Sequence, residues 1–496
     1  MSKDQFTNRW GIVLASLGMA IGAGNLWRFP RLAGQYGGSF IILWIFFLLV
    51  WSIPLLMSEF AIGKNFRRGV IGSMGLMAGK KLTWMGLFIT VCTLGIAFYY
   101  SVVTAWALRY LGFSIFGLFS NQDLRAILKA DPEFLDGFWI SVSNGNTTTT
   151  ILYILVISAG VWVISRGVPK GLERANKLLI PSLFVLLIVI AATALSMPNG
   201  IQGLEYMFVI DFVLFKDPII WIEALSQSAW STGAGWGLMM TLSSYSRKNE
   251  EIPLNTFIGA FGNNTASLMA GMAIIPAVFA LASSESEALS FLQSGNQALT
   301  FSIIPELFAS FPGGGFLSVI FFLALSLAAF TSLLSMIELM TRNLMDLGLS
   351  RKSTVGWTIA VFVLLGFPSA YSLDVFKNQD WVWGLGLIVT GFFILFALAK
   401  YGIEKFKSEY LDVNTDLKIS TGYFVWSVRV SLVMAIVLVI WWLSQDYSKY
   451  PWFDENGSWH IFDVYSNASV LTQWGVVILI GILLNRFLYR KFAEKK

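Results

Sequence analysis

An apolar segment near the start of the chain, residues 10–30, is long enough to enter a lipid bilayer but is interrupted by glycines. Its sequence is WGIVLASLGMAIGAGNLWRFP, with Gly18, Gly22 and Gly24 in the middle. Glycine exposes main-chain carbonyls at little steric cost, and unwound backbone survives at membrane depth only where protein or a cavity satisfies it. The segment therefore predicts a transmembrane helix that is broken inside the membrane and forms half of a binding site.

The composition places the rest of the chain in a membrane. Its 496 residues are 56% hydrophobic and 13% charged, and the mean hydropathy is +0.68, so we expect a polytopic membrane protein rather than a soluble enzyme. The net charge of +5 indicates no nucleic-acid partner, because membrane proteins concentrate Lys and Arg on their cytoplasmic side. The single cysteine, Cys92, excludes an intrachain disulfide, and the first apolar segment is too long for a cleaved signal peptide.

Twelve stretches of the sequence are apolar for about 20 residues, the length that crosses about 30 Å of hydrocarbon. They lie near residues 10–35, 39–63, 83–108, 149–165, 177–197, 222–245, 254–282, 315–341, 354–372, 380–400, 424–444 and 469–489. Basic residues such as Arg67 and Arg68 follow every second stretch, whereas the loop 283–314 contains three glutamates and neither Lys nor Arg. The positive-inside rule therefore predicts a multi-pass protein of the cell's inner (plasma) membrane with both termini in the cytoplasm.

A second interrupted span lies at residues 222–245, where Gly233, Gly235 and Gly237 occur in the sequence SQSAWSTGAGWG. Glycine breaks in the first and sixth spans are expected from an inverted repeat, with a binding site between the two halves. The alternative is that small residues merely let helices pack closely, but the corresponding positions of the two breaks favour the repeat. The predicted divisions are a first repeat over 1–200, a second over 201–410, and two further helices with a cytoplasmic tail over 411–496.

Five motifs occur in order along the chain: GMAIGAGNLWRFP, QYGGSF, the sixth-span break ending in SSYSRKNEE, GNNTAS with Asn263 and Ser267, and AAFTS at 328–332. Together they resemble the neurotransmitter:sodium symporter family, in particular its bacterial amino-acid members of the leucine-transporter type. The resemblance covers essentially the whole chain. It implies an all-α polytopic membrane protein with twelve transmembrane helices, a 5+5 inverted repeat and unwound helices 1 and 6. It also implies a sodium-coupled symporter that imports an amino acid by alternating access.

The resemblance implies two sodium ions as cofactors, bound by the oxygen ligands that hard cations prefer. Matched residue by residue, the first ion is held by the substrate's carboxylate and by Ala20, Asn25, Ser231 and Asn263. The second is held by the carbonyls of Gly18, Ile21 and Ala328 and the hydroxyls of Thr331 and Ser332. Neutral ligands leave the charge of the cation for the substrate to balance, which couples the two binding events. For the two hydroxyls, the alternative is a bond to the preceding helical turn.

An amino-acid substrate is also implied by the resemblance. Monoamine members have an aspartate in the first break where this chain has Gly22, so the carboxylate must come from the ligand. Helix N-termini at the breaks suit a carboxylate, and Tyr100 rather than Tyr99 matches the tyrosine that hydrogen-bonds it. The implied pocket residues are Met19, Ala20, Gly22, Gly24, Ile96, Tyr100, Trp230, Ser231, Gly233, Trp236, Ser332 and Met336.

The size of the substrate is less constrained by the sequence. Trp236 stands where many relatives have phenylalanine, and its bulk favours a small ligand, whereas Met19 and Met336 are adaptable walls. We expect a small or medium neutral amino acid; a larger hydrophobic or aromatic amino acid is the alternative. A passive channel or a non-transporting receptor would be a different class, and a channel would also use broken helices. An enzyme is not expected, because the one histidine, His460, lies beside no motif.

Charged residues inside a membrane cost about 3 kcal/mol each on insertion scales, so their presence indicates a role. Arg28 and Asp380 match the family's extracellular gate. The residues that match the inner gate are Lys3, Phe6, Tyr245 and Asp346. Lys3 and Phe6 replace the usual arginine and tryptophan, and lysine lacks the bidentate fork of arginine.

Other polar and helix-breaking residues have structural roles in the prediction. Glu59 and Glu338 are expected to accept hydrogen bonds from exposed backbone donors in the breaks. Gly171 and Pro181 match a helix-unwinding motif at the inner end of the fifth span, where proline removes a helical hydrogen bond.

Chloride is a further predicted cofactor. A neutral site that holds sodium in a low dielectric needs a compensating charge, which an external anion could supply. The matching positions are Trp44, Gln227, Ser231 and Ser267, and Trp44 replaces the tyrosine of chloride-binding relatives. The expected partners are an amino acid and the lipid bilayer; the sequence leaves monomer and dimer open.

Overall fold

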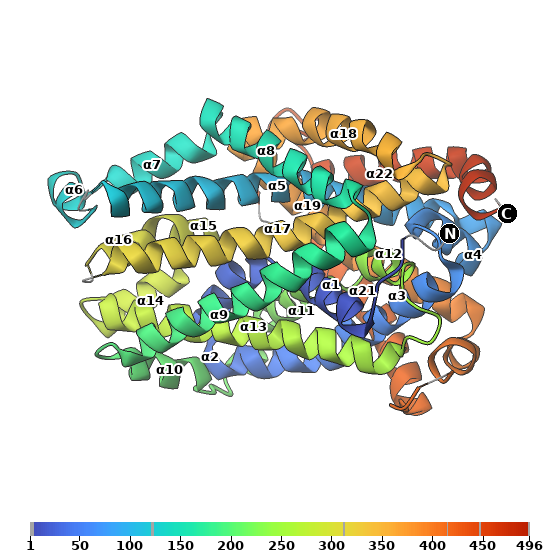
Figure 1. The fold of residues 1–496 in the computed structure, drawn as a ribbon, viewed down its shortest axis with the longest axis horizontal. Coiled ribbons are helices and arrows are strands. Elements are labelled where there is room, and N and C mark those ends of the chain that lie inside the picture. Colours follow the sequence, from blue (N-terminus) through green and yellow to red (C-terminus); the bar gives the residue numbers. More distant parts are fainter. Residues whose placement is uncertain (1–3, 121–123, 311–312, 414, 446–447, 495–496) are drawn as a thin grey trace.

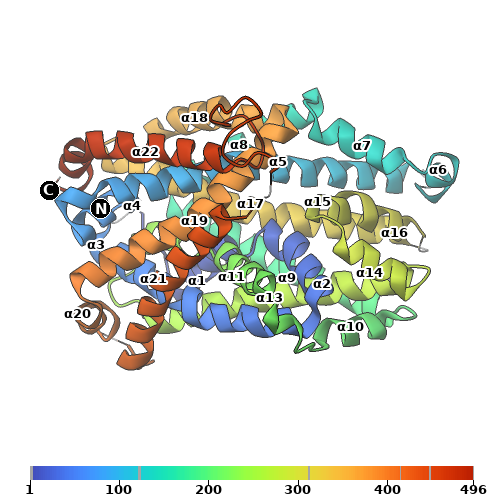
Figure 2. The same cartoon turned by 180° about the vertical axis from the view of Figure 1, so that it is seen from behind.

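The computed structural model describes residues 4–120, 124–310, 313–413, 415–445 and 448–494. These residues form an all-helical bundle, with one isolated β-bridge between Phe453 and Trp459. Figures 1 and 2 show the helices running along the long axis of the bundle, with α6 at one end and α4 at the other. The predicted all-α class is therefore confirmed.

The first two predicted spans meet within α2 (Ala23–Phe47), at a kink where Gly37 has non-helical backbone. The first span consists of α1 (Arg9–Ala20) and the beginning of α2, and the second continues from α2 through η1 (Leu48–Ser52) into α3 (Ile53–Phe66). The sixth span is α11 (Pro218–Thr232) with α12 (Leu238–Ser243). The other spans are α5 (Trp84–Phe119), α8 (Thr147–Ser165), α9 (Arg174–Ser196), α13 (Ile252–Leu281), α17 (Gly314–Asp346), α18 (Arg351–Tyr371), α19 (Leu373–Tyr401), α21 (Thr421–Leu443) and α22 (Asn467–Leu488).

Short helices connect these spans, and one more follows the last span. They are α4 (Val70–Ala78), η2 (Lys80–Leu82), α6 (Leu124–Ala130), α7 (Phe134–Ser143), η3 (Val168–Glu173), α10 (Gly200–Phe208), η4 (Leu214–Lys216), α14 (Glu285–Gln293), α15 (Asn296–Ala298), η5 (Leu299–Ile303), α16 (Ile304–Ser310), α20 (Ile403–Phe406), η6 (Lys407–Leu411) and η7 (Tyr489–Ala493).

Ten helices in the described part of the chain are long and apolar enough to cross a membrane. The two predicted spans that this count omits are the first and the sixth, which are each split into two short halves. With those halves joined, the number of spans is twelve, as predicted. The chain enters and leaves the bundle at the same end, which an even number of spans requires (Figure 1).

The two broken spans begin at recognisable start signals. Asn8 caps α1 by accepting a hydrogen bond from the backbone N–H of Gly11 at 2.9 Å. Asp217 caps α11 by accepting from Ile219 N at 2.9 Å, and Pro218 occupies the first turn. These residue types satisfy backbone donors that a helix leaves free at its N-terminus.

A bend at Gly37 turns the chain from the first span into the second. Gly37 has a φ of 59°, and a Cβ there would lie 2.7 Å from the carbonyl oxygen of Val209. Gly38 N donates to the same carbonyl at 2.7 Å, and Ser39 Oγ donates to Asp211 O at 2.9 Å. Only glycine adopts such a backbone without strain, so the bend fixes the outer end of the first span against the loop 209–211.

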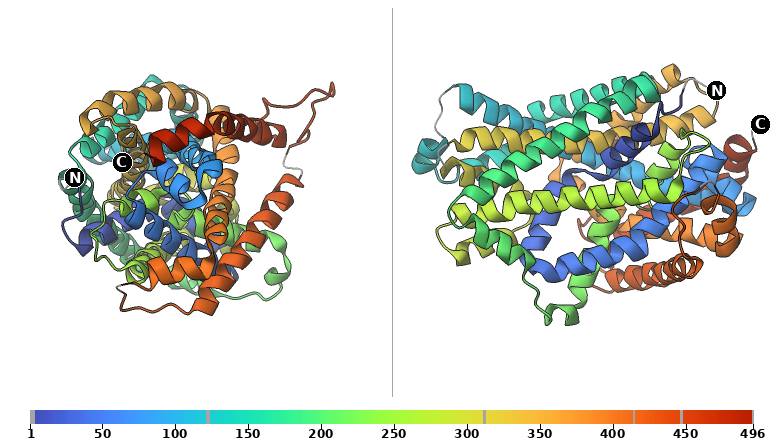
Figure 3. Two further views of the ribbon diagram at one scale, coloured as in Figure 1. Left: turned by 90° about the vertical axis from the view of Figure 1, so that its right-hand side faces the viewer. Right: turned by 60° about the horizontal axis from the view of Figure 1, so that its bottom comes forward.

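Burial separates an inner group of helices from an outer group. The most apolar stretches of α5 and α17 are 83% and 78% buried, whereas those of α18 and α21 are 33% buried. Figure 3 shows α21 and α22 at the outside of the bundle. Helices that remain apolar on their exposed faces are expected to contact lipid, so the inner group is where a polar site can be enclosed.

Candidate functional site

Both glycine-interrupted spans are unwound where the sequence predicts. In the first, α1 ends at Ala20, and the extended residues Ile21 and Gly22 precede α2. In the second, Gly233, Gly235 and Gly237 have φ values of 69°, 91° and 74° between α11 and α12. Left-handed backbone of this kind is accessible to glycine without strain, which explains the repeated glycines of GAGWG.

The sixth-span break is held by two buried side chains from neighbouring helices. Glu59 in α3 accepts hydrogen bonds from Gly235 N at 2.6 Å and Met240 N at 3.4 Å, so the predicted role of Glu59 is confirmed. Thr93 in α5 donates to the carbonyl of Trp236 at 2.6 Å. Unwound backbone groups inside the bundle are therefore paired with protein, as membrane depth requires.

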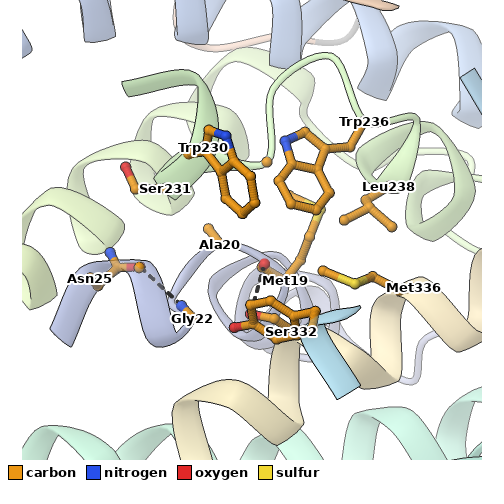
Figure 4. Close-up of a pocket in the computed structure, with 13 residues that line it drawn as sticks. Met19, Ala20, Gly22, Asn25, Trp230, Ser231, Trp236, Leu238, Ser332 and Met336 are labelled. Atoms are coloured by element: carbon orange, nitrogen blue, oxygen red, sulfur yellow. Dashed lines mark hydrogen bonds between the residues drawn. The ribbon is translucent and has the colours of Figure 1, made fainter. Parts of the chain in front are cut away.

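A small cavity lies between the two breaks. Its lining consists of Met19, Ala20, Gly22, Gly24, Asn25, Tyr100, Trp230, Ser231, Gly233, Trp236, Leu238, Ser332 and Met336 (Figure 4). Eleven of the predicted pocket residues are in this lining; Ile96 is fully buried but lies outside it. Leu238 was missed by the sequence analysis, although its position directly after Gly237 could have indicated it.

The walls of the cavity differ in character. Trp230 and Trp236 lie perpendicular to each other with ring centroids 5.2 Å apart, across the cavity from Ser332 (Figure 4). Tyr100 Oη accepts a hydrogen bond from Ala23 N at 2.8 Å. Because a tyrosine hydroxyl can accept and donate at once, Tyr100 can also donate to a ligand at the first break.

Oxygen atoms converge where the first break meets α11 and α13. Asn263 Oδ1 lies 2.8 Å from the carbonyl oxygen of Ser231 and 3.3 Å from that of Ala20. Rotating the Asn263 amide would let its nitrogen donate to both carbonyls, but would bring that nitrogen within 2.8 Å of Asn25 Nδ2, another donor. Asn25 cannot rotate in turn without loss, because its Oδ1 accepts from Gly22 N at 2.9 Å. The cluster thus has oxygens facing oxygens, which a cation stabilises.

Asn25 presents its nitrogen rather than its oxygen to this cluster. Asn25 Nδ2 donates to Asn263 Oδ1 at 2.8 Å and to Ser267 Oγ at 2.7 Å. The structure thus brings together all four residues matched to the first sodium ion, with Ala20, Ser231 and Asn263 contributing the converging oxygens.

A second oxygen cluster joins α17 to the end of α1. Ser332 Oγ lies within 3.2 Å of the carbonyl oxygens of Gly18 and Met19 and 3.4 Å from that of Ile21. One hydroxyl hydrogen cannot satisfy three carbonyls, so acceptors are in excess here. Thr331 donates instead to Ala328 O of its own helix, at 3.0 Å. The alternative of back-bonding therefore applies to Thr331 and not to Ser332.

The residues matched to chloride are only partly brought together. Asn263 Nδ2 donates to Ser231 Oγ at 3.2 Å, and Gln227 Nε2 donates to the carbonyl of Gly24 at 3.5 Å. Trp44 is buried against Phe29, with ring centroids 4.6 Å apart, and its Nε1 has no hydrogen-bond partner among the described residues.

A larger cavity adjoins the first, and its lining includes both predicted outer-gate residues, Arg28 and Asp380. Arg28 is ion-paired with Glu223 at 2.8 Å and donates to Ser226 at 3.0 Å; the ion pairs of the described residues include none between Arg28 and Asp380. Gly24, Tyr100 and Trp230 line both cavities. Glu223 was not singled out by the sequence analysis, because nothing local links it to Arg28.

A buried network of charged and polar side chains lies near the N-terminus, at the end predicted to face the cytoplasm. Arg351 donates to the two carboxylate oxygens of Glu338 at 2.7 and 2.9 Å, to Tyr245 Oη at 3.1 Å and to Asp4 at 3.1 Å. Tyr245 also donates to Glu338 at 2.6 Å. The prediction that Glu338 bonds backbone donors of the breaks is therefore wrong, since its hydrogen-bond donors are Arg351 and Tyr245. In the sequence, Arg351 is one of the basic residues that follow the eighth predicted span, and the positive-inside rule alone accounts for it.

The other predicted inner-gate residues include Asp346 and Lys3. Asp346 accepts from Gly69 N at 2.5 Å and pairs with Arg342 at 3.3 Å, whereas Lys3 lies outside the described residues. In the fifth span, η3 and α9 are continuously helical past Gly171 and Pro181. The unwinding expected there is thus not present in the described residues 168–196.

Comparisons with known proteins agree with this architecture. The model of the sodium:neurotransmitter symporter family matches residues 3–122 and 138–486. An uncharacterised sodium-dependent transporter of Methanocaldococcus jannaschii is 28% identical over 459 residues, covering 88% of this chain and 89% of its own. The sodium-dependent neutral amino acid transporter B(0)AT2 of Bos taurus is 25% identical, covering 55% of this chain and 40% of its own.

Among solved structures, the crystal structure of MhsT in complex with L-phenylalanine matches with a TM-score of 0.77. The identity is 27%, and the match covers 88% of this chain and 99% of that one. The family match over most of the sequence, the two broken helices and the twelve spans agree. The chain therefore belongs to the sodium:neurotransmitter symporter family.

Proposed function

We propose that this protein is a sodium-coupled symporter that imports a small or medium neutral amino acid by alternating access. The observation that carries the proposal is the cluster at the first break, where Asn263 Oδ1 faces the carbonyl oxygens of Ser231 and Ala20. A cation among these oxygens would replace repulsion by attraction. The carboxylate of an amino acid would then balance the added charge, which makes each binding event favour the other.

Two sodium ions are proposed, one at each oxygen cluster. The first ion would bind among Ala20, Asn25, Ser231 and Asn263, next to the oxygens that already converge there. The second would bind Ser332 and the carbonyls that converge on it, together with Thr331 and Ala328 on the same face of α17. Hydroxyl and carbonyl oxygens are suitable ligands for a hard cation.

The substrate would lie in the cavity between the breaks with its carboxylate toward Tyr100. Its amine would meet backbone carbonyls, because the described lining of the cavity contains no acidic side chain. The side chain would face Trp230, Trp236, Leu238 and the methionines. L-phenylalanine bound to MhsT and the neutral substrates of B(0)AT2 support a neutral amino acid; an aromatic substrate is the second candidate, favoured by the MhsT complex.

Alternating access would use the two cavities and the inner network in turn. With Arg351 bound to Glu338, the inner end is closed while the outer cavity leads toward the site. The outer cavity would close when the Arg28 side chain leaves Glu223 and pairs with Asp380. Residues 1–200 and 201–410 would act as the two inverted repeats, and residues 411–496 would lie outside them. The protein would reside in the plasma membrane with both termini in the cytoplasm. A chloride ion would also bind near Ser267.

A thermal-unfolding screen of the twenty amino acids, with sodium and with potassium, tests this function. We expect one or a few small or medium neutral amino acids to stabilise the protein only with sodium, and the same compounds to enter proteoliposomes down a sodium gradient. Stabilisation and uptake that are identical in potassium would overturn sodium coupling. Uptake limited to aromatic amino acids would select the second candidate.

A further inference from the structure

Asn176, in the inner half of α9, is a fully buried amide with one unused oxygen. Its Nδ2 donates to the carbonyl of Leu172, one turn earlier, at 3.0 Å. Its Oδ1 has no hydrogen-bond partner in the part of the chain that the structure describes. Buried polar atoms without a partner are rare in folded proteins, so this oxygen calls for a specific explanation.

The unused oxygen points at α1. A Cβ placed on Gly18 would lie 2.1 Å from Asn176 Oδ1 and 2.9 Å from its Cγ. The oxygen therefore rests directly against the Cα of Gly18, where it can accept a weak C–H···O contact. Any larger residue at position 18 would push the two helices apart. Close contact at this point requires both glycine and a short side chain opposite.

Gly18 is also one of the residues whose carbonyl converges on Ser332, at 3.2 Å. Its Cα is held by α9 on one side while its carbonyl faces α17 on the other. Leu172, which holds the nitrogen of Asn176, lies in η3 next to Gly171. One amide thus links the inner end of the fifth span to the backbone that forms the second oxygen cluster.

We propose that Asn176 is a positioning residue for the second sodium site. It fixes Gly18 so that its carbonyl faces Ser332. The amide does not touch the ion; it orients a ligand, as outer-shell residues do in metal sites generally. The inference rests on the proposed function, because it takes the carbonyl of Gly18 as a sodium ligand.

Substitution of both contact residues tests this role in the full chain. Asn176→Ala should raise the sodium concentration for half-maximal amino-acid binding by about 10-fold, the usual scale for loss of an outer-shell partner. Amino-acid binding at saturating sodium should stay near that of the unmodified protein. A control is Ser182→Ala on the same helix, whose hydroxyl only donates to Leu178 O and whose loss should leave the sodium dependence unchanged.

Gly18→Ala supplies a second, independent measurement. Its Cβ would collide with Asn176, so the single variant should lose sodium-dependent binding, and adding Asn176→Ala should restore it to the level of Asn176→Ala alone. A sodium dependence of Asn176→Ala equal to that of the control would overturn the proposal, as would a loss in Gly18→Ala that the second substitution does not relieve. Absence of sodium dependence in the unmodified protein would refute the proposed function instead.

Discussion

Removal of Arg351 should open the inner end of the bundle. The side chain of Glu338 is 0% exposed and that of Arg351 is 10% exposed, and Glu338 accepts three hydrogen bonds, two of them from Arg351. Arg351→Met leaves a buried carboxylate with Tyr245 as its remaining donor. Breaking one side of a buried ion pair costs about 3–5 kcal/mol. In the proposed transport cycle only the inward-closed arrangement contains the pair, so its loss should destabilise that arrangement relative to an inward-open one.

At 1.4 kcal/mol for each factor of ten, the lower limit of about 3 kcal/mol corresponds to a shift of about 100-fold in the equilibrium between the two arrangements. The change is measurable with a thiol reagent, since the one native cysteine, Cys92, is buried. A cysteine introduced by Phe6→Cys would report on the inner end, because Phe6 is 2% exposed and its N–H donates to Tyr245 O at 3.1 Å.

We expect Arg351→Met to accelerate labelling of the introduced cysteine by at least tenfold. Adding Glu338→Gln removes the uncompensated charge, so the double variant should label more slowly than Arg351→Met alone. A monodisperse Arg351→Met protein that labels at the rate of its parent would refute the reasoning, since the network would then not hold the inner end closed.

Three further changes test other parts of the site. Glu223→Gln removes the partner of Arg28; the Glu223 side chain is 28% exposed, and an ion pair of this kind is worth about 0.2–1 kcal/mol. We therefore expect at most about a fivefold change in the amino-acid association rate, diminishing with salt; a change that does not depend on salt would contradict an electrostatic role for this pair. Trp236→Phe should extend the accepted substrates toward larger side chains in a competition panel, and an unchanged panel would mean that Trp236 does not limit size. Exchange of chloride for gluconate should reduce uptake, with Ser267→Glu removing the requirement; insensitivity of the unmodified protein would exclude chloride.

The sequence predicts the fold well because its signals are local. Span length and loop charge locate the helices, and glycine clusters locate both breaks, since unwound backbone needs those residues wherever the rest of the chain lies. Most of the cavity follows for the same reason. Residues such as Met19 and Trp236 adjoin the breaks directly.

Charge pairing is where the sequence is insufficient. Arg28 and Glu223 are 195 positions apart, and their contact depends on how α2 packs on α11. Arg351 reads as one more cytoplasmic charge until α18 brings it beneath Glu338, and the partner of Glu338 was therefore predicted wrongly. No local pattern distinguishes a carboxylate that bonds backbone donors from one that bonds a distant arginine.

The bend at Gly37 has a mechanical consequence. By binding Val209 and Asp211, it anchors the outer half of the first span to the loop that leads into α11. The outer halves of the two broken spans, α2 and α11, are thus linked through this loop as well as through their direct packing. They should tilt as one rigid body. Spin labels on α2 and α11 should keep a constant separation through the transport cycle, while the distance from either label to α19 changes.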